Sequence, residues 1–237
     1  MKEDAFSRKR RPDRRRVICG LVCSVAVTPA MSSELDMSLN HKAKWRSFGI
    51  DDWAQHDPFE RSKPGAERQP YSKWHLNAQS NSIDQLLDLI AFAEAGSKQY
   101  NAVHMSAQVL PLAPPTRLTI SEIYEWISAT PKQHHAIGRY QFIPSTLRSL
   151  VRRAGLSKHE TFSQTTQDRL ARILLRDAGF NKVKAGTLSR ERFMDNLAGI
   201  WAGLPLKSGH SRYRGIAGNR ATISRVFFEA QIRNILG

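Results

Sequence analysis

Two short segments hold the residues of this chain that are best suited to acid chemistry. Glu94 ends an apolar helical stretch between Ala93 and Ala95, and the sequence Gly-Arg-Tyr-Gln occupies residues 138–141. A carboxyl group among apolar neighbours can keep its proton near neutral pH and give it to a leaving-group oxygen, the step that breaks a glycosidic bond. Glycine permits a tight turn, and Gln141 offers an N-acetyl group both a donor and an acceptor. Taken singly, each segment also fits an ordinary role, as a surface glutamate or as a loop leading into a helix.

The elements that must position these residues are predicted to be helical. Apolar residues recur at helical spacing from residue 81 onward, and no alternating strand of convincing length occurs. Ser82 is the expected cap of the first helix, Thr119 begins the second, and a short hairpin would fit within residues 100–118. Residues 81–237 are therefore predicted to form one mainly α domain. Its expected helices span 83–95, a segment from 119, 145–154, 166–178, 190–202 and 221–236.

Residues 31–80 have a different character. They are polar and lack sustained periodicity, and three prolines interrupt any long helix. We expect a linker or an extended wrap on the main domain. Trp45, Trp53 and Trp74 could clamp sugar rings, but isolated tryptophans more often anchor a loop to a core.

The first thirty residues have the layout of a secretory signal peptide. The arginine-rich segment 8–16 precedes the apolar run 17–27 and then Thr28-Pro29-Ala30. The apolar run is short for a membrane span, which needs about 20 residues. We therefore predict export to the periplasm or beyond the cell, with residues 1–30 as the signal. Two alternatives stay open: a weak anchor with transient membrane contact, or a basic tail on a cytoplasmic protein whose true start is Met31.

The charge of the chain favours a polyanionic partner without choosing one. The formal net charge is +15, and residues 81–237 hold 21 Lys and Arg against 11 Asp and Glu. Nucleic acid, an anionic membrane and peptidoglycan would all be attracted by such a field. The only cysteines, Cys19 and Cys23, lie in the N-terminal apolar run, so the predicted domain has no disulfide and no cysteine metal site.

Several further motifs, in order and spacing, make the chain similar to a known family. Residues 83–237 resemble the bacteriophage lambda endolysin family, a lysozyme-like group of lytic transglycosylases. The resemblance implies an α+β, mainly helical lysozyme-like fold. The matching segments are residues 93–96, 100–103, 136–144, 162–163 with 167–168, 200–205, and 209–213 followed by 218–219.

The resemblance also implies roles for particular residues. It makes Glu94 the catalytic acid and places the turn at 138–141 on the floor of a substrate cleft, with Tyr213 at its rim. Gln167 and Asp168 look structural, as a tie between a helix and a loop, and Trp201 is expected in the core. The implied substrate-binding residues are Tyr100, Arg139, Tyr140, Gln141 and Tyr213.

Neither a metal nor a cofactor is predicted. His134 and His135 could contact a saccharide, but no third metal ligand stands at a suitable spacing.

The sequence shows no evident second acid. Glu122, Glu125 and Asp177 are the nearest candidates, and all three are expected on solvated helix faces. Retaining and inverting hydrolases use two carboxyl groups, so a lone acid favours the transglycosylase route. In that route Glu94 protonates the leaving oxygen and then accepts a proton from the C6 hydroxyl of N-acetylmuramic acid, which closes on C1 as a 1,6-anhydro end.

The predicted activity is therefore cleavage of peptidoglycan strands at the β-1,4 bond between N-acetylmuramic acid and N-acetylglucosamine, by a monomer that does not bind nucleic acid. A hydrolytic lysozyme acting on the same bond is the first alternative. A helical nucleic-acid binder is another, supported by arginines at 148, 152, 153, 169, 172 and 176. A non-catalytic peptidoglycan-binding protein is the third, although it would be expected to lack the acid at position 94. Prophage lysis, wall remodelling and assembly of a secretion machine all fit as biological roles.

Overall fold

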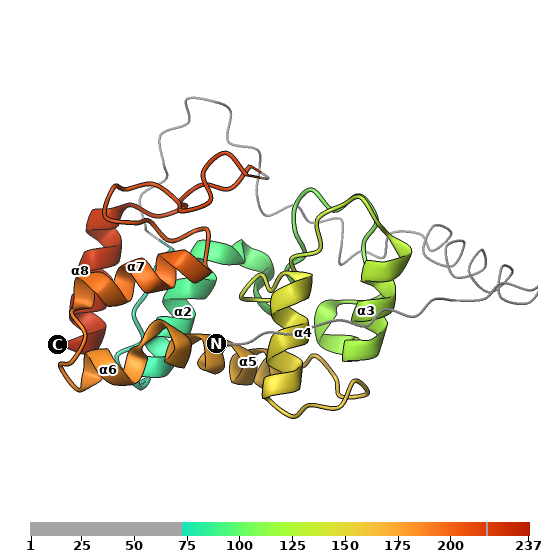
Figure 1. The fold of residues 1–237 in the computed structure, drawn as a ribbon, viewed down its shortest axis with the longest axis horizontal. Coiled ribbons are helices and arrows are strands. Elements are labelled where there is room, and N and C mark those ends of the chain that lie inside the picture. Colours follow the sequence, from blue (N-terminus) through green and yellow to red (C-terminus); the bar gives the residue numbers. More distant parts are fainter. Residues whose placement is uncertain (1–72, 217) are drawn as a thin grey trace, which may run out of the picture.

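Helices carry the fold of residues 73–216 and 218–237, the part of the chain that the computed structural model describes (Figure 1). The predicted mainly helical class is confirmed. The α-helices are α2 (Ser82–Glu94), α3 (Ile120–Ala129), α4 (Pro144–Arg153), α5 (Gln164–Ala178), α6 (Phe180–Lys184), α7 (Arg190–Ile200) and α8 (Arg225–Leu236). Two 3₁₀ helices, η2 (Gly96–Asn101) and η3 (Pro115–Arg117), lie between α2 and α3. The predictions for residues 1–30 and 31–72 fall outside the described residues.

The expected hairpin within residues 100–118 is not formed. Extended pairing in the described segments is limited to isolated bridges, which join Val103 to Ile137, Ile137 to Phe142, and Thr119 to Thr161. Val103 therefore pairs with Ile137, the residue before the 138–141 turn. Prolines within 110–118 remove the backbone donors that a hairpin ladder would need.

Side-chain caps explain where the helices begin. The cap of α2 is Asn81 and not the predicted Ser82, because the Asn81 side chain accepts from the N–H groups of Ile83 and Asp84 (3.0 and 3.1 Å). Helix α3 begins where it was expected, after Thr119, and the structure shows a capping box there in which Thr119 and Glu122 bond reciprocally. Helix α8 begins later than predicted because Ser224 caps it. Sequence reasoning missed the short helix α6.

Helix α2 lies at the centre of the domain and determines where Glu94 is placed. Its buried face includes Leu86, Leu87, Leu89 and Ile90, and it packs against α5 and α8. Figure 1 shows α6, α7 and α8 on one side of α2 and α3 and α4 on the other. The C-terminal end of α2 continues into loop 95–119 and is bonded by loop 201–224 through Gly203 and Thr222. Loop 130–143 is bonded to both of these loops, through Gly138 to Ala102 and through Tyr140 to Trp201, and we call the end of the domain that the three loops form the Glu94 end.

The segment before α2 packs on this core. Trp74 lies against Phe92 and Phe227, with ring centroids 5.3 and 6.2 Å away, and its Nε1 donates to Oε1 of Gln231 (3.0 Å). Trp74 thus anchors a loop to the core, as expected for isolated tryptophans. In the described part of the chain, no helix has the length and apolar character needed to cross a membrane.

Candidate active site

Glu94 is the last residue of α2, and its carboxyl group is held by a backbone donor from a distant turn. The N–H of Gly203 donates to Oε1 of Glu94, with 2.7 Å between the two atoms. Burial raises the pKa of Glu94 from the ordinary 4.5 to about 7, and the Gly203 bond acts in the opposite direction by favouring the carboxylate. At neutral pH this group is therefore suited both to give a proton and to take one back.

The turn that carries Gly203 is fixed to the end of α2. A Cβ on Gly203 would lie 2.5 Å from the carbonyl oxygen of Ala93 and 2.9 Å from Oε1 of Glu94, so the close approach requires glycine. The hydroxyl of Thr222 donates to the Ala93 carbonyl (2.7 Å), and its N–H donates to the Gly203 carbonyl (2.9 Å). Trp201 is 3% exposed, in the core as predicted, and its Nε1 donates to the Tyr140 carbonyl (3.2 Å). These bonds connect the Gly203 turn to both predicted site segments.

The segment Gly138–Gln141 forms the expected tight turn. Ile137 and Phe142 exchange backbone hydrogen bonds on either side of it, at 3.2 and 3.0 Å. Gly138 has a φ of 79°, and a Cβ there would lie 2.5 Å from Oε1 of Gln167, so glycine is required. Gln141 also has a positive φ, 45°, and its Nε2 donates to the Gly138 carbonyl (2.9 Å). Its side chain is partly exposed, and its contact with a saccharide stays a prediction.

Arg139 is bonded on every side to protein groups. Its guanidinium donates to Oδ1 of Asp88 (2.7 Å), to Oε1 of Gln99 (2.9 Å), and to the hydroxyls of Tyr100 (3.3 Å) and Tyr140 (3.2 Å). Its charge is thereby paired with Asp88, and four of its five N–H donors have partners within the fold. Through these bonds Arg139 fixes the 138–141 turn to α2 and to η2.

The two tyrosines of this network converge on one carboxylate. The hydroxyls of Tyr100 and Tyr140 donate to Asp168, at 3.0 Å in the case of Tyr100. Burial, followed by the bond to Asp168, raises the pKa of Tyr140, so its hydroxyl remains a donor. Tyr140 is only 1% exposed, which leaves a saccharide almost no surface to touch. The structure therefore brings Tyr100, Arg139 and Tyr140 together, as predicted, in positions that support the turn, while direct contact with substrate stays a prediction.

Gln167 ties α5 to the same turn. Its Oε1 accepts the N–H of Arg139 (2.8 Å), and its Nε2 donates to the carbonyls of Tyr100 (3.1 Å) and Phe162 (3.0 Å). The side chain is fully buried. Gln167 and Asp168 thus form the helix-to-loop tie that was expected of them.

The remaining predicted contacts lie on the two flanking loops. The Tyr213 hydroxyl donates to the carbonyl of Gly199, next to the C-terminus of α7, and its side chain is partly exposed. His135 is buried against Trp126 and bonds Thr130 (2.9 Å), so it belongs to the core. His134 is exposed and lies against His104, with ring centroids 4.8 Å apart and the rings tilted by 42°.

The three candidates for a second acid lie on exposed faces, as expected. Glu122 is in the cap of α3, Asp177 forms an ion pair with Arg153 (2.6 Å), and Glu125 is near Ser121 on the outer face of α3. Loops 95–119, 130–143 and 201–224 contain neither Asp nor Glu. Within the described ranges, no three His, Cys, Asp or Glu side chains gather as a metal site would require.

Sequence reasoning missed four groups that hold the site: the Gly203 N–H and the side chains of Thr222, Asp88 and Gln99. Gln99 has a backbone conformation that non-glycine residues rarely adopt (φ 46°, ψ −123°). Of these four, only Gly203 could have been suspected from the sequence. It lies in the segment 200–205, which resembles the family, and a glycine there permits a close approach of two backbone segments. The other three are joined to the site by contacts remote in sequence.

Because folding raises the pKa of Glu94, the stability of the protein should depend on pH in a defined direction. Below pH 4.5 the carboxyl is protonated in both the folded and the unfolded chain. As the pH rises to about 7, only the unfolded chain releases the proton, so the free energy of unfolding falls, and above 7 the loss is complete. The free energy of unfolding of Glu94→Gln should therefore exceed that of the wild type by about 3 kcal/mol at pH 8. At pH 4 the two values should be similar. Urea unfolding of both proteins at the two pH values measures this difference, and an equal difference at both pH values would contradict it.

Comparison with known proteins gives one match. A model of the endolysin family matches residues 84–229, from the first turn of α2 into α8. No curated protein and no solved structure matches the chain. The matched segment includes Glu94, the 138–141 turn, Gly203 and Tyr213.

Proposed function

The chain belongs to the endolysin family, and we propose that it cleaves peptidoglycan with Glu94 as the catalytic acid. The bond that we assign is the β-1,4 linkage between N-acetylmuramic acid and N-acetylglucosamine. One observation carries the assignment: a carboxyl group with a pKa of about 7, fixed by the Gly203 N–H at the end of a central helix. A general acid works best when its pKa lies near the working pH, and this carboxyl meets that condition.

We further propose that the reaction is a transglycosylation. Protonated Glu94 gives its proton to the glycosidic oxygen as the bond to C1 breaks, and the Gly203 N–H stabilises the carboxylate that results. The carboxylate then takes the proton from the C6 hydroxyl of the same muramyl unit, whose oxygen bonds to C1. Glu94 returns to its starting form, and the product has a 1,6-anhydro end. Because the nucleophile belongs to the bound sugar, no second carboxylate is needed to hold a water molecule.

The other proposed roles follow from exposure. Gln141 and Tyr213 are partly exposed next to the turns that hold the site, so we propose them as the saccharide contacts. Tyr100, Arg139 and Tyr140 act as positioning residues through their bonds to Asp88 and Asp168. The substrate lies outside the cytoplasm, and the basic and apolar segments in residues 1–30 support export as the route to it.

The structure offers less support for nucleic-acid binding. Arg153 and Arg172 form ion pairs with Asp177 and Asp84, and Arg169 donates to the carbonyl of Ala154. Two of the six arginines named for that alternative are therefore neutralised by acids of the same domain, and a third is bonded within the fold.

Digestion of peptidoglycan in water enriched in heavy oxygen tests the reaction type. Transglycosylation should release unlabelled fragments that are lighter by one water than hydrolytic fragments, as read by mass spectrometry. A hydrolytic lysozyme run in parallel should give labelled reducing ends. Labelled ends from this protein would contradict transglycosylation and leave peptidoglycan cleavage standing, whereas the absence of fragments would contradict cleavage itself.

A further inference from the structure

The loops of the Glu94 end are cationic and carry no acidic side chain. Residues 95–119, 130–143 and 201–224 contain neither Asp nor Glu. The charged side chains that these three loops themselves carry are therefore all basic, while acids such as Asp88, Asp168 and Glu191 touch the loops from helices α2, α5 and α7. The Lys and Arg residues of the loops are Lys98, Arg117, Lys132, Arg139, Lys207, Arg212, Arg214 and Arg220.

Some of these cations are already engaged, and others are not. Arg139 forms an ion pair with Asp88 (2.7 Å), and Lys207 with Glu191 (2.8 Å). Among the described residues, the ion pairs do not include Lys132, Arg212 or Arg220, and all three residues are exposed. These three cations are available to an anion in solution.

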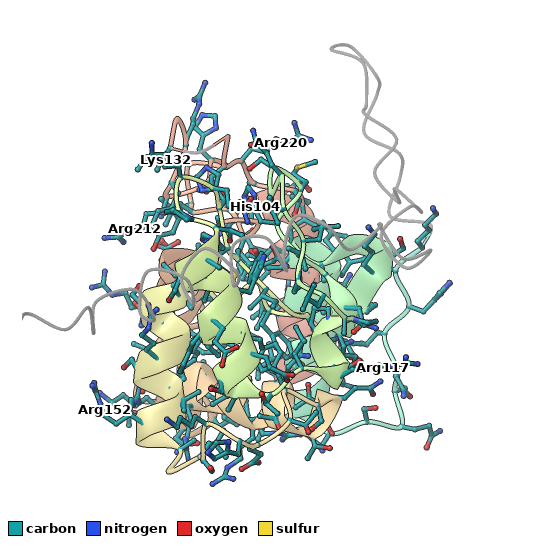
Figure 2. The ribbon with its side chains drawn as sticks, turned by 90° about the vertical axis from the view of Figure 1, so that its right-hand side faces the viewer. His104, Arg117, Lys132, Arg152, Arg212 and Arg220 are labelled. Atoms are coloured by element: carbon teal, nitrogen blue, oxygen red, sulfur yellow. The ribbon has the colours of Figure 1, made fainter. Side chains whose placement is uncertain are left out.

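The available cations lie at one end of the molecule. Figure 2 shows Lys132, Arg212 and Arg220 together with His104 at the upper end, while Arg117 and Arg152 lie in the lower part. The loop that carries Arg212 and Arg220 is hydrogen-bonded to the end of α2 through Gly203 and Thr222. Arg220 lies two residues before Thr222, which bonds the Ala93 carbonyl beside Glu94. The guanidinium of Arg212 lies over Gly199, whose carbonyl accepts from Tyr213.

We propose that Lys132, Arg212 and Arg220 recognise the carboxylates of the peptides attached to the muramyl units, so that the enzyme prefers strands that carry free carboxylates. The inference rests on the proposed function. A guanidinium group matches a carboxylate in shape and charge, and a one-signed field around a site raises the local concentration of an oppositely charged substrate. An anionic membrane would also be attracted, but a membrane on this face would cover Glu94. A peptide-bearing strand places its carboxylates beside the bond to be cut.

The test combines two substrates with two variants. One substrate is untreated peptidoglycan, and the other is peptidoglycan whose carboxylates have been converted to neutral amides. One full-length variant carries Arg212→Gln and Arg220→Gln. The matched control carries Arg152→Gln and Arg176→Gln, which remove the same charge at exposed arginines of α4 and α5. Arg152 lies in the lower part of Figure 2, and Arg176 lines a hollow with Ile83, at the opposite end of α2 from Glu94.

At low ionic strength the wild type should cut the untreated substrate about tenfold faster than the neutralised one, and added salt should reduce this preference. The Arg212→Gln/Arg220→Gln variant should lose most of the preference, and the control should retain it. Equal rates of the wild type on both substrates would overturn the inference and leave the proposed function intact. A preference that survives in the first variant would also overturn it.

Two further outcomes are distinguishable. Failure of the wild type to cut either substrate would count against the proposed function itself. Anionic phospholipid vesicles serve as the competing probe. If they bind the wild type and the control but not the first variant, and the substrate preference is absent, the cations belong to a lipid site and the inference is wrong.

Discussion

Replacing Glu94 with glutamine should reduce the rate of peptidoglycan cleavage by about a thousandfold, enough to abolish clearing in a cell-wall zymogram. Glutamine has nearly the shape of glutamate, and its carbonyl oxygen can still accept the Gly203 N–H that Glu94 accepts at 2.7 Å. It has no acidic proton to give to a leaving oxygen. The loss should therefore be chemical, with the folded structure retained.

The matched control is Glu125→Gln, the same chemical change on the exposed face of α3. It should clear the gel as the wild type does. The expected gain in stability of Glu94→Gln at pH 8 serves as an independent sign that the inactive protein is folded. Clearing by Glu94→Gln at the wild-type rate would remove Glu94 from the catalytic role and leave family membership unaffected.

The parts of the fold that were predictable from the sequence are those set by local pattern. Helices α2, α3, α4, α5 and α7 all coincide with predicted segments, because apolar spacing and caps such as Thr119 lie within a few residues of each other. Helix α6 was missed because it has only five residues between Gly179, which is left-handed with a φ of 102°, and Ala185. A pattern of that length has too few apolar positions to show a period.

The sequence allowed the catalytic acid and the 138–141 turn of the candidate site to be predicted. It did not allow prediction of the residues that hold the acid and the turn in place. The Glu94 segment and the 138–141 turn are short continuous motifs. Their supports come from elsewhere in the chain: Gly203 for Glu94, and Asp88 and Gln99 for Arg139. A sequence gives no sign that Arg139 is enclosed by such partners, so it appeared equally fit to touch substrate. Burial of Tyr140 likewise follows from how α5 packs beneath the turn.

Gly203 provides the sharpest test of that long-range support. Gly203→Ala places a methyl group 2.5 Å from the Ala93 carbonyl oxygen and 2.9 Å from Oε1 of Glu94, closer than real Cβ contacts come. Either the turn or the end of α2 must move. Overpacking of this kind costs about 1–3 kcal/mol of stability. Displacing a catalytic group by about 1 Å can cost about a hundredfold in rate, so activity should fall well beyond what the loss of stability explains.

Gly199→Ala is the control for Gly203→Ala. It shows whether a loss of activity comes from the clash at the Gly203 turn or from any glycine-to-alanine change in this part of the domain. Gly199, in α7, has its nearest Cβ contact at 3.7 Å, with Arg212, an ordinary van der Waals distance. Gly199→Ala should therefore keep its activity and gain up to about 1 kcal/mol from better helix propensity. In Gly203→Ala, alanine keeps the backbone N–H, but the forced shift of the turn should lengthen or break its bond to Oε1 of Glu94, and the pKa of Glu94 should then rise further because that bond favours the carboxylate. The basic limb of the pH–rate profile, where the acid loses its proton, should then move to higher pH. An unshifted profile with wild-type activity would show that the Gly203 N–H does not govern the proton of Glu94.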